Sequence, residues 1–182
     1  MKSVVHALAA IAAMASFSTL GMAEDCLEVG SGVGAFYVTD VTGPAAGTKL
    51  CYRCRFKDRP VVSIFTREMN DNVAALIKEV DGTVSENQGR DMAAFVVLLT
   101  DNPEGQEAAL KKVAQSQGIQ NTPLTTFDGV AGPPSYKLPK EGDVTVMMWV
   151  DGKLKVNETL SASDLSSAKI STVVKKSSEI LN

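Results

Sequence analysis

Three apolar runs without charged side chains mark the middle of the chain, at residues 60–66, 93–99 and 144–150. Short runs of this kind are typical of strands that are buried on both faces of a sheet. Upstream of them, alternation over 35–41, a turn around Gly43-Pro44 and a return arm at 49–51 predict a β-hairpin.

Helical periodicity follows each of the first two runs. The first helix is expected to begin at Asn70 or Asp71 and to end at Gly82. Its inner face is formed by apolar residues at i, i+3, i+4 and i+7, namely Val73, Leu76, Ile77 and Val80.

The second helix is expected to begin at Asn102-Pro103 and to end at Gly118, because proline suits the first helical position and glycine the C-cap.

The last third of the chain begins with an irregular insert at 119–142, within which 124–127 has the composition of a short strand. After the run at 144–150, Asp151-Gly152 predicts a two-residue hairpin turn and a return strand over 154–158. Ser161 and Asp164 resemble a capping box, and the apolar positions between Ile170 and Leu181 predict a final helix.

This order of elements predicts an α/β fold. Strand–helix–strand units pair their strands in parallel through right-handed crossovers, and the Asp-Gly hairpin adds antiparallel strands. We therefore expect a mixed sheet with helices on both faces, preceded by an N-terminal β-hairpin.

The N-terminus has the layout of a cleavable secretory signal over residues 1–23. Lys2 is followed by an alanine-rich apolar stretch, and Gly21-Met22-Ala23 places small residues at the cleavage positions. Residues 24–34 are expected to be a flexible, glycine-rich lead-in, and 35–182 a single domain. A protein of this layout is periplasmic or secreted, and no later run is long enough for membrane insertion.

Charge and histidine content exclude several function classes. The formal net charge is −3 and well mixed, so the chain has no basic footprint for nucleic acid. Its single histidine, His6, lies inside the expected signal. The processed chain therefore has no Ser-His-Asp or Cys-His machinery and no histidine for a zinc site. Nothing in the sequence calls for a cofactor.

Three cysteines remain, at positions 26, 51 and 54. Export implies a compartment in which disulfides persist, and an odd number leaves at least one cysteine outside an intramolecular pair. Cys26 lies in the glycine-rich lead-in, so we expect it to stay outside the main pair. The candidate site is therefore Cys51-Tyr52-Arg53-Cys54, a Cys-x-x-Cys motif.

The order of elements over residues 33–181 resembles the thioredoxin superfamily. The extra hairpin before Pro60 and the insert between Gly118 and Val144 are most similar to its peroxiredoxin and redoxin-like branch. This resemblance implies redox chemistry at a cysteine after the first core strand and a cis-proline before the third. Here Thr66-Arg67 and Asp143 stand at those places. Thr66 and Arg67 are interpreted more simply as a solvated helix entry than as an anion site.

The Cys-x-x-Cys motif lies instead before the strand at 60–66. A strand of that length spans roughly 20 Å, so the pair should lie near the end opposite the superfamily's active site. Nearby positive charge from Arg53, Arg55, Lys57 and Arg59 favours a thiolate, which is the nucleophile.

Two function classes follow. The first is an exported thiol–disulfide oxidoreductase that uses Cys51 and Cys54 on other exported proteins bearing thiols or disulfides. The second is a non-catalytic binding or structural domain in which Cys51–Cys54 staples the hairpin. A metal site is a weaker alternative, because only Cys26 adds a third thiolate and zinc usually takes four ligands.

Overall fold

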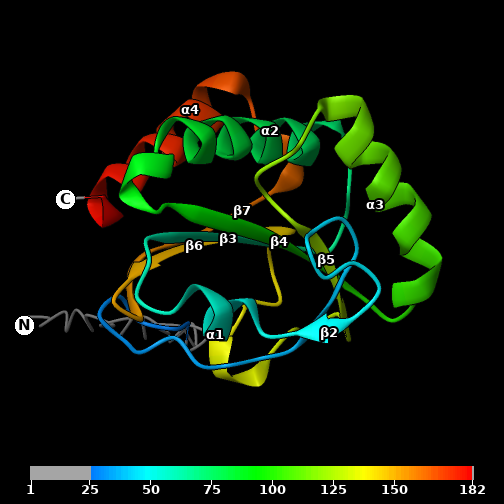
Figure 1. The fold of residues 1–182 in the computed structure, drawn as a ribbon, viewed down its shortest axis with the longest axis horizontal. Coiled ribbons are helices and arrows are strands. Elements are labelled where there is room, and N and C mark those ends of the chain that lie inside the picture. The colour runs from blue at the N-terminus through cyan, green and yellow to red at the C-terminus, as the bar shows by residue number, and fades with distance from the viewer. Residues whose placement is uncertain (1–25, 182) are drawn as a thin grey trace, which may run out of the picture.

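The structure, a computed structural model, describes residues 26–181. The expected signal over 1–23 lies outside this range. The fold is built on a seven-stranded sheet in the order β2-β1-β5-β4-β3-β6-β7 (Figure 1). The strands are β1 Val38–Asp40, β2 Lys49–Leu50, β3 Val61–Thr66, β4 Ala93–Thr100, β5 Leu124–Asp128, β6 Val144–Val150 and β7 Lys153–Leu160.

Helices cover both faces of this sheet, as predicted. One face carries α2 Asp71–Glu86, α3 Pro103–Gln117 and α4 Ser167–Lys175, and the other carries the short α1 Tyr52–Phe56 (Figure 1). The described part of the chain also contains short 3-10 helices, at η1 Gln88–Arg90, η2 Pro134–Tyr136, η3 Ala162–Asp164 and η4 Lys176–Ile180. None of the described helices is both long and apolar enough to cross a membrane.

Strand pairing confirms the mixed sheet. β3 pairs in parallel with β4, and β4 in parallel with β5, through the crossover helices α2 and α3. β6 runs antiparallel to β3, and β7 antiparallel to β6. Asp151 and Gly152 both have positive φ, 54° and 69°, as the tight turn between β6 and β7 requires. β1 and β2 form the N-terminal hairpin, which joins the sheet through β5.

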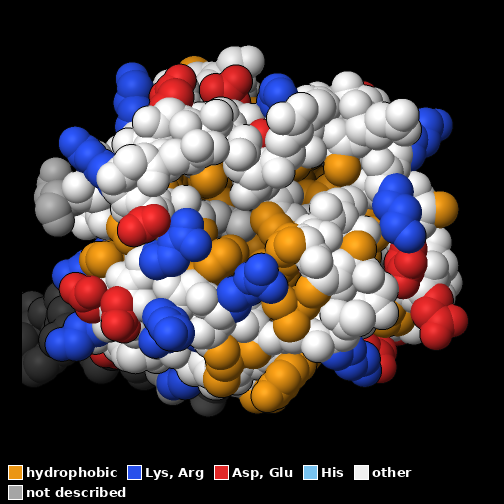
Figure 2. All heavy atoms as spheres, viewed as in Figure 1, with side chains coloured by type: hydrophobic (Ala, Val, Ile, Leu, Met, Phe, Trp, Pro, Cys, Tyr) orange, Lys and Arg blue, Asp and Glu red, His pale blue; other side chains and the backbone are white. Residues whose placement is uncertain are grey.

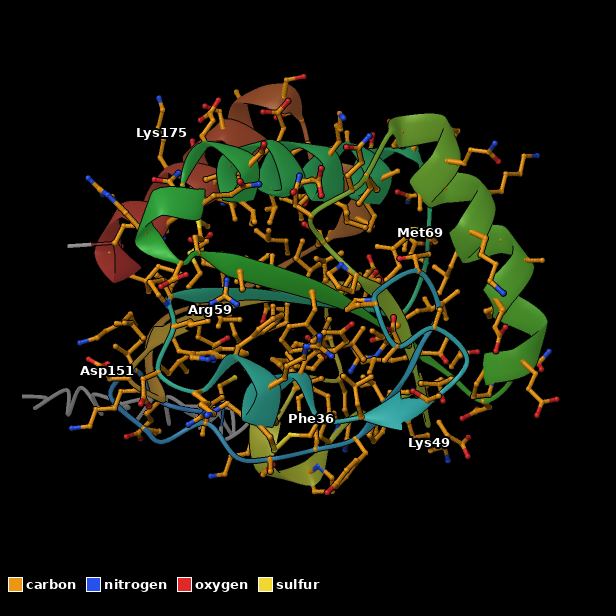
Figure 3. All side chains as sticks on the ribbon, in the orientation of Figure 1. Phe36, Lys49, Arg59, Met69, Asp151 and Lys175 are labelled. Atoms are coloured by element: carbon orange, nitrogen blue, oxygen red, sulfur yellow. A yellow bond between two sulfur atoms is a disulfide. The ribbon has the colours of Figure 1, made fainter. Side chains whose placement is uncertain are left out.

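Alternation along the buried strands produces two separate cores. In β3, Val62 and Ile64 face the layer of α2 and α4, whereas Val61 and Phe65 face the layer of α1. The second core is rich in aromatic rings, and Phe36 lies within it (Figure 3). Both faces of β3 are thus apolar, which explains its uncharged sequence.

Two predicted helix boundaries were wrong. α2 does not end at Gly82 but continues to Glu86. Gly82 has no positive φ there, and burial of Val84 in the core offsets the cost of about 1 kcal/mol for a glycine within a helix. The final helix does not begin after Ser161, because the carboxylate of Asp143 accepts the amide of Ala162 and the hydroxyl of Ser161. Instead α4 begins at Ser167, after Ser166 as its cap.

The N-terminal stretch expected to be flexible is joined to the sheet in its described part. Gly30 donates its amide to Leu154 O at 2.7 Å, and Leu154 donates back to Ser31 O at 3.0 Å. Val33 is buried in the aromatic core. These contacts place residues 30–33 along the start of β7, where they cover an otherwise open sheet edge.

Candidate functional site

Cys51 and Cys54 form a disulfide, with their Cα atoms 5.2 Å apart. Cys51 does not belong to the return arm of the hairpin, as the sequence suggested, because β2 ends at Leu50. It is the N-cap of α1, and its Sγ accepts a hydrogen bond from the amide of Cys54 at 3.0 Å. The motif is therefore a strand-to-helix turn that is closed by a disulfide.

The two sulfur-bearing residues differ in their access to solvent. Cys51 is 7% exposed, whereas Cys54 is exposed to solvent. A reacting group that approaches from solvent therefore meets Cys54 first, and Cys51 lies behind it against the body of the protein. The disulfide thus joins an exposed cysteine, at which exchange could begin, to a buried one.

Tyr52, between the two cysteines, anchors the motif to the fold. Its ring stacks on Phe95 of β4 with centroids 5.3 Å apart, and its hydroxyl donates to Asp40 Oδ2 at 2.9 Å. Asp40 is fully buried and also accepts the amides of Gly43 and Ala45. Burial, and then the hydrogen bond to Asp40, raise the pKa of Tyr52 well above its usual range.

The four basic residues near the motif differ in their partners and exposure. Arg59 lies over the ring of Phe56 and donates to Asp91 O and Met92 O, which holds its charge at the start of β4 (Figure 3). Arg53 donates to Val33 O and Lys57 O. Arg55 and Lys57 are exposed. The backbone carbonyls that Arg53 and Arg59 bind therefore offset part of the positive charge near the motif.

Contacts of α1 and of the turn after it place them at the amino end of β3, as the position of the motif in the chain implied. Asp58 O accepts the amide of Asp151, in the turn between β6 and β7, at 3.1 Å. A Cβ atom at Gly152 in the same turn would meet the Arg53 guanidinium, which therefore lies directly against this turn. The disulfide-bearing helix thus packs against this turn.

At the carboxyl end of β3, Arg67 occupies the region expected for the superfamily's active site. Its guanidinium donates to Val130 O at 3.0 Å, Gly142 O at 2.7 Å and Pro139 O at 2.8 Å. The interpretation of this segment as a solvated helix entry was therefore wrong. Arg67 fastens the insert between β5 and β6 over this end of the sheet.

Asp143 precedes β6, where the superfamily carries its cis-proline. Its carbonyl accepts the amide of Arg67, and its carboxylate binds the Ser161 and Ala162 turn. Residues 26–181 contain no cis peptide bond. This end of the fold is therefore held by polar contacts of Asp143 and Arg67.

Cys26 is a free and exposed cysteine, in line with the prediction that it stays outside the main pair. No group of three or more histidine, cysteine, aspartate or glutamate side chains is arranged for a metal ion in the described part of the chain.

Comparison with solved structures decides the fold. A protein from Bacteroides thetaiotaomicron described as a candidate disulfide isomerase superposes with a TM-score of 0.63 at 16% identity, over 85% of this chain and 91% of that one. The fold is thioredoxin-like. No protein-family description matches the sequence, and the curated proteins contain no match to it.

Two further solved structures with this fold are a thiol–disulfide oxidoreductase domain and a peroxiredoxin, which agrees with the branch suggested by the sequence. The thioredoxin domain of a thiol–disulfide oxidoreductase from Bacteroides vulgatus has a TM-score of 0.59 at 16% identity, covering 86% of this chain and 99% of that one. Yeast mitochondrial 1-Cys peroxiredoxin has a TM-score of 0.60 at 15% identity, covering 81% and 73%. At these identities the likeness concerns the fold.

Sequence reasoning found the Cys51–Cys54 pair but missed its anchor. Nothing in the spacing of Tyr52 and Asp40 indicates that they meet, because twelve positions and a turn separate them. One signal was available, since an aspartate next to the apolar Val41 in a predicted strand needs a hydrogen-bonding partner once it is buried. The role of Arg67 had no such signal.

Proposed function

We propose that this thioredoxin-like protein is an exported thiol–disulfide oxidoreductase that works through Cys51 and Cys54. One observation carries the proposal: an exposed Cys54 is bonded to an inner Cys51 whose sulfur already accepts a backbone amide. Exchange needs an accessible sulfur to attack and a stabilised sulfur to leave. The asymmetric pair supplies both.

Exchange would proceed in two displacements. A thiolate of a partner protein attacks Cys54 Sγ, which forms a mixed disulfide and releases Cys51 as a thiolate. The amide of Cys54, 3.0 Å from that sulfur, stabilises the charge. A second partner thiolate then attacks the partner's own sulfur and releases Cys54. Two electrons pass to this protein, the partner gains a disulfide, and the partner's two protons balance the new thiols.

Export is part of the proposal. It rests on Lys2, the apolar stretch after it and the Gly21-Met22-Ala23 site in the sequence. The partners would be other periplasmic or secreted proteins that carry thiols or disulfides. The intact mass of the protein recovered from the cell envelope tests this part, because cleavage after Ala23 leaves Glu24 as the first residue. A mature protein that begins at Met1 would refute it.

Redox titration against glutathione tests the chemistry. We expect the Cys51–Cys54 couple to have a potential above the value of roughly −300 mV below which structural disulfides lie. Turnover of a model disulfide should be lost in Cys54→Ser and retained in Cys26→Ser, which is the matched control. A bond that stays closed across the titration, with no turnover, would exclude the oxidoreductase.

A second candidate function is a non-catalytic domain in which the disulfide only staples α1 to the hairpin. The observation that favours it is Arg67, which fastens the insert over the end of the sheet where this superfamily reacts. This candidate predicts a very negative potential. It also predicts a lower melting temperature in Cys51→Ser, limited because the closed loop is short.

A further inference from the structure

A cleft of about 580 Å³ opens beside α1, and neither candidate function assigns it a ligand. Figure 2 shows a hollow across the middle of this face, with hydrophobic side chains at its floor and basic side chains along its lower side. Its volume is in the range of small-molecule sites. Its lining includes the apolar residues Pro44, Phe56, Val84, Met92, Ile119 and Pro123.

The cleft carries positive charge without acidic side chains. Arg55 and Arg59 line it, and no aspartate or glutamate does. Arg59 is oriented by Asp91 O, Met92 O and the ring of Phe56, while its Nη1 group lies outside these hydrogen bonds. Within residues 26–181 the guanidinium of Arg55 makes no hydrogen bond or ion pair, although its backbone amide donates to Cys51 O. Its charge therefore remains available to a ligand.

Both walls of the cleft are held in place by buried carboxylates. Asp81 accepts the amides of Gln120 and Asn121 at one wall, and Asp40 accepts the amide of Gly43 and the hydroxyl of Tyr52 at the other. Because these hydrogen bonds lie behind the lining, they hold both walls of the cleft in one geometry. A pre-organised site loses less free energy on binding.

We infer that this cleft binds an organic anion, with its carboxylate between Arg55 and Arg59 and an apolar body against Phe56, Met92 and Ile119. A guanidinium that is held in one geometry is suited to carboxylate recognition. Gln88 and Asn121 add polar groups to the lining. Cys51 and Cys54 are not part of the lining, although Tyr52 and Arg55 of the same turn are, so the inference does not rest on the redox chemistry.

Titration of the oxidised, 15N-labelled protein with 4-phenylbutyrate tests the inference. A ligand of this size should bind with a dissociation constant of about 1 mM. The amide signals of residues 88 and 119–122 should shift. The neutral 4-phenylbutyramide has the same shape and should bind about fivefold more weakly or worse.

Two variants test which basic side chain binds the carboxylate. Arg55→Gln should weaken 4-phenylbutyrate binding by about two- to fivefold, whereas Lys57→Gln, with the same loss of charge outside the lining, should not change it. Unchanged spectra and melting temperatures would show that both variants fold. Equal binding of the acid and the amide, an unaffected Arg55→Gln, or signal changes confined to another face would each overturn the assignment.

Discussion

The hydroxyl of Tyr52 donates a hydrogen bond to Asp40 Oδ2 at 2.9 Å and so ties the Cys-x-x-Cys turn to strand β1. Because Asp40 also accepts two amides of the hairpin loop, one carboxylate organises both segments. The position of α1, and with it the exposure of Cys54, depends on this contact. The predictions below begin with it.

Removal of the Tyr52 hydroxyl should destabilise the fold. We expect Tyr52→Phe to lower the free energy of unfolding by about 1–2 kcal/mol, because a buried carboxylate loses a donor. Urea denaturation measures this change. Tyr37→Phe is the matched control, because Tyr37 is 68% exposed, and it should stay within about 0.5 kcal/mol of the parent protein. Equal effects of the two substitutions would contradict the anchoring role.

Arg67 should matter for the insert rather than for redox activity. Arg67→Gln is expected to cost about 2–4 kcal/mol of stability, since its guanidinium reaches three separate carbonyls. Limited proteolysis should then cut within residues 129–142. Arg90→Gln, which loses a single exposed hydrogen bond to Leu181 O, provides the comparison and should resist cleavage there. An intact insert in Arg67→Gln would show that other contacts hold it.

The two cysteines should react at different rates once separated. In a Cys26→Ser background, Cys51→Ser leaves the exposed Cys54, and Cys54→Ser leaves the buried Cys51. Alkylation of Cys54 should be about tenfold faster or more, because a buried thiol reacts only after local opening. Iodoacetamide labelling followed by mass spectrometry measures both rates. In denaturant the difference should vanish, and a difference that persists there would reflect chemistry other than burial.

Alkaline pH should destabilise the protein. Burial raises the pKa values of Tyr52 and Tyr136 above the ordinary value of 10.0. Above about pH 10 the unfolded chain releases these protons while the folded chain keeps them, so the free energy of unfolding falls as pH rises. Below pH 10 both states keep the protons and this contribution is fully present. Denaturation curves measured at intervals from about pH 8 to about pH 12 test this expectation.

Tyr136→Phe provides the control for that pH dependence. Its hydroxyl donates to Gly34 O at 2.9 Å, so the variant should be less stable at neutral pH. It should nevertheless lose stability less steeply above pH 10, because one buried phenol no longer titrates. A slope identical to that of the parent protein would assign the alkaline effect to other groups.

Local pattern was enough to find most elements of the fold. The runs at 61–66, 93–100 and 144–150 are strands of one sheet, and the caps at Asn70, Asn102 and Gly118 lie where predicted. Such signals act within a few residues of the chain, where steric and hydrogen-bonding preferences are strong. The errors at Gly82 and Ser161 arose where tertiary burial or a distant carboxylate outweighed a local preference.

By itself, the sequence determined the α/β class, the resemblance to thioredoxins and the displaced Cys51–Cys54 pair. Tertiary structure alone decided which sulfur-bearing residue is exposed, what Arg67 holds and which groups surround the cleft at Arg55 and Arg59. These features depend on contacts between residues far apart in the chain, such as Tyr52 with Asp40 or Arg67 with Gly142. Periodicity and spacing record only which way a side chain faces, whereas its partner is selected by how the layers pack.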